Sequence, residues 1–268
     1  MHDSHDNSSD TRHRGEATPR LQVVLSRAGV DSRRHAASII REGRVEVNGV
    51  VVREPGEHID PARDSIRVDG RLVDTRSRPR TRTILLYKPR GLLCSSTDDL
   101  GPTVFECLRG VRERVVCCGR LDKDSEGLLL LTNDGDVALR LTHPRYGHSK
   151  EYAVTVRGAF DGATLRALRS IRTLEDDGTP VRPVEVEVVD SDPSRSRHLL
   201  RMTLHEGRNR QIRRMCEQVG LRVERLVRTA VDGLRLPRDM MPGDWRDLAP
   251  RECARLLSPK SNPHPATE

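Results

Sequence analysis

Hydrophobic positions in the first quarter of the chain follow two periods in turn. Residues 20–29 carry apolar side chains three and four positions apart and end in glycine, as an amphipathic helix does. Residues 32–43 repeat this pattern between a capping serine and a second glycine. Alternating stretches follow at 44–52, around an Asn-Gly pair, and at 64–73. The pattern predicts a small module of two short helices and hairpins.

Beyond this module the apolar residues form strand-like runs. Seven of them predict strands, at 83–89, 114–121, 128–132, 151–158, 184–189, 198–204 and 223–229. Three segments of helical period lie between them, at 134–142, 161–171 and 208–219. Because strands outnumber helices and mostly do not alternate with them, we expect an α+β domain built on a mixed, largely antiparallel sheet flanked by helices.

Polar segments without a period predict the domain boundaries. Residues 1–18 predict a disordered tail, and the basic, proline-bearing residues 74–82 predict a linker. The linker would separate a helix-rich module at 19–73 from a larger domain at 83–257. Residues 258–268 predict a loose tail.

Charge narrows the class of partner. The net charge is +7 and the pI is near 9.4, so nucleic acid, the ribosome or an anionic membrane is the natural partner. No stretch approaches the roughly 18 apolar residues that a membrane span needs, and the opening "MHDSHDNSSD" lacks the apolar core of a signal peptide. We therefore expect a cytoplasmic protein that binds no membrane. Aromatic residues make up only 2%, which argues against a sheet that stacks RNA bases on several exposed rings.

The six cysteines carry no metal-binding signature. They form no C-x-x-C pair and have no histidine at ligand spacing. This pattern predicts free thiols in a reducing compartment, no metal site and no disulfide.

The second predicted helix carries a basic stripe. Arg34 and Arg41 fall on one side of it, together with Ser38. Such a stripe is often a solvated helix face. Here the whole stretch "SRRHAASIIREGRVEVNG" resembles the small RNA-binding module of ribosomal protein S-four. The resemblance implies binding of structured RNA, with Arg33, Arg34 and Arg41 as candidate contacts.

The stretch "GRLDKDSEGLLLLTNDG", 119–135, places three acids directly before an unbroken apolar run. A calcium loop of EF-hand type would need a closing carboxylate at position 133, which is Asn133, and a loop where "LLLLT" stands. An acidic turn facing solvent suits Asp124 and Glu126 but explains Asp122 poorly. A glycosidase-like acid pair acting at a sugar C1′ is a third reading.

The same stretch resembles the catalytic motif of RsuA-type ribosomal RNA pseudouridine synthases. The resemblance continues through "YKPRG" at 87–91, "LTHPRYGHSKEYAVTV" at 141–156 and "EGRNRQIRRMCEQVG" at 206–220, and covers about residues 20–255. It implies isomerisation of a uridine to pseudouridine in ribosomal RNA by base flipping, without a cofactor. The segment "RNRQIRRMCE" looks closer to large-subunit members, and a small-subunit substrate stays open.

The resemblance also implies roles for single residues. Asp122 would be the essential carboxylate, Tyr152 would pack on the target base, and Arg213 would pair with Asp122. Asp124 and Glu126 would be structural and hydrogen-bond to the backbone of the loop. Whether Asp122 forms a covalent adduct or stabilises a glycal path stays open.

Several basic residues are candidate RNA contacts. Arg120 would fill the stack left by the flipped base or contact a phosphate. Lys88 would line the cleft, with a structural role as the alternative. Arg208, Arg210 and Arg214 would face RNA phosphates or plain solvent.

Two rival functions remain. One is a non-catalytic ribosome-assembly factor, against which the trio of Asp122, Tyr152 and Arg213 argues. The other is a metal-dependent nuclease or glycosidase, which EDTA insensitivity would exclude. For the favoured function we expect a monomer without a metal or small-molecule cofactor.

Overall fold

The computed structural model describes residues 18–75, 81–95 and 101–258. The chain divides into two compact units, Met1–Arg80 and Thr81–Glu268. The tails predicted to be disordered at 1–18 and loose at 258–268 lie almost wholly outside the described residues. In the described part, no helix is both long and apolar enough to cross a membrane.

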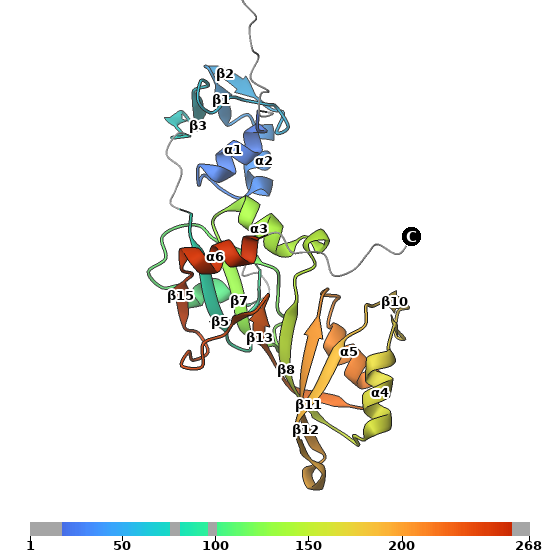
Figure 1. Cartoon of the computed structure of the whole chain (residues 1–268). Helices are drawn as coiled ribbons and strands as arrows, with labels where there is room; N and C mark the ends of the chain where they lie inside the picture. Colours follow the sequence, from blue (N-terminus) through green and yellow to red (C-terminus); the bar gives the residue numbers. More distant parts are fainter. Residues whose placement is uncertain (1–17, 76–80, 96–100, 259–268) are drawn as a thin grey trace, which may run out of the picture. The chain divides into compact units, whose positions relative to one another are not determined.

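The N-terminal unit joins two helices to a small antiparallel sheet (Figure 1). Its elements are α1 (Leu21–Arg27), α2 (Arg33–Arg41), β1 (Val45–Val47), β2 (Val50–Val52), β3 (Ile66–Val68) and β4 (Arg71–Leu72), with the strands in the order β2-β1-β3-β4. Ser32 caps α2 by accepting a hydrogen bond from the His35 amide at 3.0 Å. Asn48 and Gly49 both have positive φ, as a tight hairpin between β1 and β2 requires. The predicted helices and hairpins of this segment are confirmed.

The second unit is built on a nine-stranded sheet with the path β11-β12-β8-β13-β7-β5-β15, with β14 paired to β13 and β6 paired to β7. The strands are β5 (Thr83–Lys88), β6 (Val116–Cys118), β7 (Glu126–Thr132), β8 (Lys150–Arg157), β11 (Glu185–Asp192), β12 (Arg197–Leu204), β13 (Arg222–Val231), β14 (Leu234–Arg235) and β15 (Trp245–Asp247). Within this sheet β7 pairs with β13 in parallel and the other pairings are antiparallel. The expected mixed, largely antiparallel sheet is confirmed.

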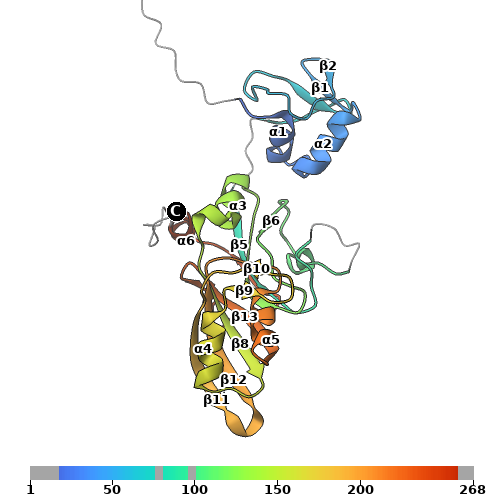
Figure 2. The same cartoon turned by 90° about the vertical axis from the view of Figure 1, so that its right-hand side faces the viewer.

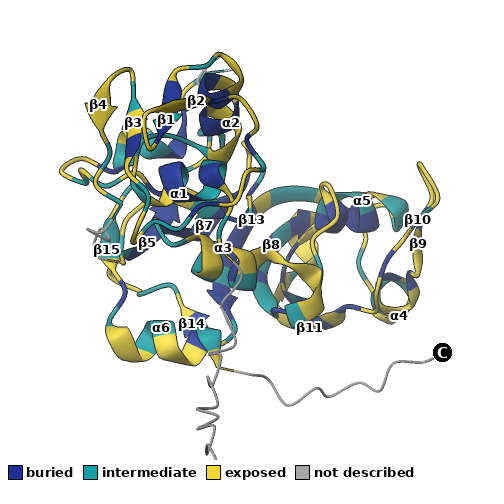
Figure 3. Cartoon of the chain, turned by 90° about the horizontal axis from the view of Figure 1, so that it is seen from above, coloured by how far each residue is buried: buried dark blue, intermediate teal, exposed yellow. Residues whose placement is uncertain are grey.

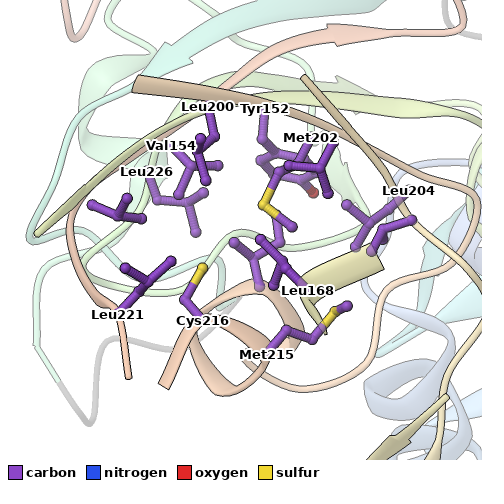
Figure 4. Close-up of a cluster of buried hydrophobic side chains, with 14 of the residues drawn as sticks. Tyr152, Val154, Leu168, Leu200, Met202, Leu204, Met215, Cys216, Leu221 and Leu226 are labelled. Atoms are coloured by element: carbon purple, nitrogen blue, oxygen red, sulfur yellow. The ribbon is translucent and has the colours of Figure 1, made fainter. Parts of the chain in front are cut away.

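Helices cover the sheet in two places. α4 (Gly162–Ser170) and α5 (Gln211–Gln218) lie against β8, β11, β12 and β13 (Figure 2). Between them Tyr152, Met202, Leu168 and Met215 point toward one another in a shared core (Figure 4). α3 (Gly135–Thr142) and α6 (Pro250–Leu257) share a second core with β5 and β7. In Figure 3 much of α4 and α6 is exposed, whereas the central strands β5 and β7 are buried throughout.

Several elements differ from the prediction. The strand predicted at 114–121 is shorter in the structure, where it is β6. The helix predicted at 208–219 begins later, because Arg210 at its N-cap has a left-handed φ of 46°. The short pair β9 (Thr173–Leu174) and β10 (Thr179–Pro180), the edge strand β15 and the helix α6 were not predicted.

Along one of its edges, strand β7 pairs with two different strands, and the sheet opens between these two pairings. β13 pairs only with its first two residues, Glu126 and Gly127, whereas β6 pairs with its last three, from Leu130 to Thr132. Gly127 has a φ of +109°, and a Cβ there would lie 2.6 Å from the backbone nitrogen of Arg228. Only glycine permits this close approach of β7 to β13. Between the two pairings the strands separate.

Candidate active site

Asp122 lies in a tight loop between β6 and the central strand β7. The Ser125 amide donates to the Asp122 carbonyl at 3.0 Å and closes the turn. Asp122 itself is half-buried. The run that follows it is fully buried in β7, as predicted for a central strand. Most of the would-be calcium loop, from Glu126 to Thr132, is thus part of strand β7.

Lys88 is a buried support of this loop. Its side chain has 0% exposure, and its Nζ donates to the carbonyls of Pro89 and Ser125 at 2.8 Å each and of Lys123 at 3.4 Å. Burial lowers the pKa of Lys88, while the charges of Asp122 and Asp124 act in the opposite direction. Of the two roles predicted for Lys88, the structure favours the structural one over an RNA contact, because the ammonium group is enclosed by backbone carbonyls.

The side chain of Arg213 contacts the backbone of the same loop. Its Nη2 donates to the Asp124 carbonyl at 3.1 Å, and its Nη1 donates to the Val223 carbonyl at 3.5 Å. Burial is the main cause that lowers the pKa of Arg213, and the nearby charge of Asp122 opposes it. Within the described residues no ion pair of 4.0 Å or less joins Arg213 to Asp122. The predicted pairing of Arg213 with Asp122 is thus present as an interaction of the two charges through space, and a direct ion pair stays a prediction.

The other two acids of the motif contact arginines. Glu126 is buried, and its Oε1 accepts from Arg225 Nε at 2.8 Å, a pair that raises the pKa of Arg225. Asp124 is exposed, with its Oδ2 4.0 Å from Arg210 Nη1. In the described part of the chain neither carboxylate accepts the hydrogen bond from the loop backbone that was predicted. The turn is closed by main-chain atoms, Glu126 is occupied by Arg225, and the exposed Asp124 carboxylate has only the distant Arg210 beside it.

The basic residues around α5 are used in different ways. Arg214 Nε donates to Asp176 at 2.7 Å, and its Nη2 lies 2.5 Å from Asp177. Two carboxylates thus neutralise Arg214 in the protein alone, and its contact with RNA phosphates stays a prediction. Arg208 and Arg210 are exposed, and Arg208 Nε lies only 3.5 Å from Glu206.

A cleft of about 320 Å³ lies where the sheet opens. Cys118 and Leu130 of the β6–β7 pair form one side, and Lys150 and Tyr152 of β8 belong to its lining. Arg120, two positions before Asp122, also lines it. Tyr152 is 9% exposed, so it belongs both to the core and to the cleft. The structure thus brings Arg120, Tyr152 and Arg208 to one cleft, next to the loop of Asp122.

One cleft residue was missed by sequence reasoning. Arg228 is 3% exposed and lines the cleft from β13. Only one feature of the sequence could have pointed to Arg228. It stands two positions after the buried Leu226 in a strand, where an apolar residue is expected.

On the N-terminal unit the candidate RNA contacts lie on one helix. Arg33, Arg34 and Arg41 of α2 are exposed. The opposite side of α2 buries its alanines and isoleucines. The stripe is therefore accessible, as a binding surface requires.

Comparisons with known proteins agree with this arrangement. The family model for RNA pseudouridylate synthase matches residues 82–218, and that for the S4 domain matches residues 19–64. The chain belongs to the RNA pseudouridylate synthase family. It is therefore an isomerase acting on RNA, with an RNA-binding S4 domain at its N-terminal end.

Relatives of this pseudouridine synthase extend over most of its length. A ribosomal large subunit pseudouridine synthase B of Bacillus subtilis is 41% identical over 88% of this chain and 95% of its own. A protein of the same name from Escherichia coli O157:H7 is 40% identical over 85% of this chain and 79% of its own. A crystal structure of a pseudouridylate synthase matches with a TM-score of 0.62 and 28% identity, covering 89% of this chain and all of the other.

Proposed function

We propose that this enzyme converts one uridine of large-subunit ribosomal RNA to pseudouridine, with Asp122 as the essential carboxylate. The observation that carries the proposal is the position of Asp122. It lies on a loop held by Lys88 and Arg213, beside a basic cleft lined by Tyr152. The names of the Bacillus subtilis and Escherichia coli relatives support the large subunit as substrate. We further propose that the enzyme works in the cytoplasm as a monomer.

The reaction would need the target nucleotide outside its stack, because the base must turn over while bound. The N1–C1′ bond breaks, the base rotates, and C5 bonds to C1′ and loses its proton, while N1 gains a proton, so that substrate and product are isomers. Asp122 would attack or stabilise the electron-poor sugar or base. Tyr152 would pack on the ring of the base, and Arg120 would fill the vacated stack or hold a phosphate.

Arg213 would act on Asp122 through the loop. A cation that holds the Asp124 carbonyl fixes the backbone two residues after Asp122. Its charge also interacts with that of Asp122 through space. Arg208 and Arg210, both exposed, would contact RNA phosphates.

The direct test is to map pseudouridines in ribosomal RNA from a strain that lacks the gene. Carbodiimide–reverse transcription should show one stop missing from large-subunit RNA. The stop should return with the wild-type gene but not with an Asp122→Asn gene. A loss in small-subunit RNA would overturn the substrate, and an unchanged map would favour a non-catalytic assembly factor.

The α2 stripe should contribute to RNA affinity through phosphates. Replacing Arg33, Arg34 and Arg41 with glutamine should weaken rRNA binding and flatten its salt dependence. Each lost phosphate contact lowers the slope of log K against log salt by about 0.9 for duplex or 0.7 for single strands. Filter binding between about 50 and 200 mM salt measures the slope.

A matched control replaces Arg63, Arg67 and Arg71, which are also exposed in this unit but lie off α2. This control removes the same charge and should leave most of the slope intact. Equal slopes for the two triple variants would mean that α2 is only a solvated face.

A further inference from the structure

Arg228 is a buried cation without an acidic partner. It is 3% exposed, and no carboxylate among the described residues lies within 4.0 Å of it. Burying an unpaired charge is costly, and the buried Glu126 avoids that cost by pairing with Arg225 of β13. The retention of an unpaired guanidinium therefore calls for a partner that the protein alone does not supply.

One edge of the guanidinium has a structural use. Arg228 Nε donates to the Leu128 carbonyl at 2.7 Å. Leu128 lies between the two residues of β7 that pair with β13 and the three that pair with β6. The side chain thus replaces a missing ladder hydrogen bond where the sheet opens. This bond also fixes the plane of the guanidinium.

The other edge of the guanidinium belongs to the cleft. Arg228 lines the cleft together with Tyr152, which stands opposite it in the pairing of β13 with β8. Neither Nη atom is among the buried polar atoms of the described residues that lack a partner, so these donors are accessible from the cleft. Arg120 and Arg208, which are exposed, can serve phosphates at the mouth. Only a group inserted deeply can reach Arg228.

We propose that Arg228 binds the target base itself, by donating from its Nη groups to a carbonyl oxygen of the flipped uracil. This inference rests on the proposed function. Arginine offers donors only, and the outer edges of uracil offer the acceptors O2 and O4. A planar ring packed against Tyr152 would present one of these oxygens to the neighbouring residue of β13.

The symmetry of uracil explains why a fixed donor suits this reaction. Rotation of the ring about the axis through N3 and C6 exchanges N1 with C5, which is the exchange that the reaction requires. The same rotation exchanges the C2 and C4 carbonyls. A donor at one fixed place therefore meets a carbonyl oxygen before and after the turn. Cytosine would present its amino group in one of the two orientations, so that a hydrogen-bond donor of the base would face the donors of Arg228.

The test combines altered protein with altered base. Single-turnover rates are measured with saturating enzyme on an rRNA fragment whose target is uridine, 2-thiouridine or 4-thiouridine. Sulfur accepts hydrogen bonds weakly, so one thio substitution should slow the wild-type enzyme by roughly 10- to 100-fold. The same substitution should cost Arg228→Lys and Arg228→Gln less than about 3-fold, because the contact is already lost.

Two outcomes would overturn the inference. One is equal thio effects in wild type and both variants, which would make Arg228 purely structural. The other is a wild-type rate that neither thio substitution changes, a result that does not depend on how the variants fold. Pseudouridine formed from the unmodified fragment by the wild-type enzyme keeps the proposed function intact in either case. Failure of that reaction would instead count against the proposed function.

Discussion

Replacing Asp122 with asparagine is expected to abolish pseudouridine formation, lowering the single-turnover rate on the order of 10⁴-fold or more. Asparagine keeps the size of the side chain but cannot act as a nucleophile or stabilise positive charge. RNA affinity should stay within about 3-fold of wild type, because no positive charge is lost. Release of tritium from RNA labelled at C5 of uridine measures the rate.

Asp124→Asn is the matched control, because it removes the same charge two positions along the loop. Asp124 is exposed and uses only its backbone carbonyl to hold Arg213. This variant should retain most of the activity. Turnover by pure Asp122→Asn protein, or equal losses in the two variants, would remove Asp122 from its proposed role.

Lys88→Met is expected to give the next largest loss, roughly 100-fold in turnover, without a matching loss of RNA affinity. Methionine fills similar space but leaves three carbonyls, two of them in the Asp122 loop, without their donor. Each unpaired buried acceptor costs about 1–3 kcal/mol, and a displacement of about 1 Å at a reacting group can cost 10²-fold. The melting temperature should fall by about 5–10 °C.

The control for this variant is Lys123→Met, which alters an exposed lysine of the same loop. It should leave the melting temperature unchanged. A Lys88→Met enzyme of wild-type stability that binds RNA poorly would restore Lys88 to the RNA contacts. Thermal unfolding, filter binding and tritium release together separate the two roles.

Sequence patterns predicted the fold well where burial follows a simple period. The two helices of the N-terminal unit and the strands β8 and β12 each show such a period, and the structure has them close to the predicted places. Strand β5 is instead an unbroken buried run, and it too lies where its apolar residues predicted a strand. Short elements carry too few positions to show one, as in the edge strand β15. The helix α6 was missed although its start carries usable signals, a proline at its first turn and Glu252 at its third position.

The partners of charged residues could not be predicted, because they depend on tertiary contacts. Glu126 pairs with Arg225, which lies 99 positions away in the chain. Lys88 was predicted to line the cleft or to be structural, and Arg214 to face phosphates or solvent, but the sequence did not show that carbonyls would enclose Lys88 or that aspartates would bind Arg214. Motif resemblance placed Asp122, Tyr152 and Arg213 in one region, but not the backbone route by which Arg213 reaches the loop.

Because Lys88 is enclosed, the chemical reactivity of its amine can report on the opening of the Asp122 loop. The chain has only four lysines, Lys88, Lys123, Lys150 and Lys260, so amine-reactive labels produce a simple peptide map. Lys123 is exposed and should be acylated quickly, whereas the Lys88 amine can react only after it leaves the three carbonyls. The ratio of the two labels would therefore report how often the Asp122 loop opens, in solution and during RNA binding, without any change to the sequence.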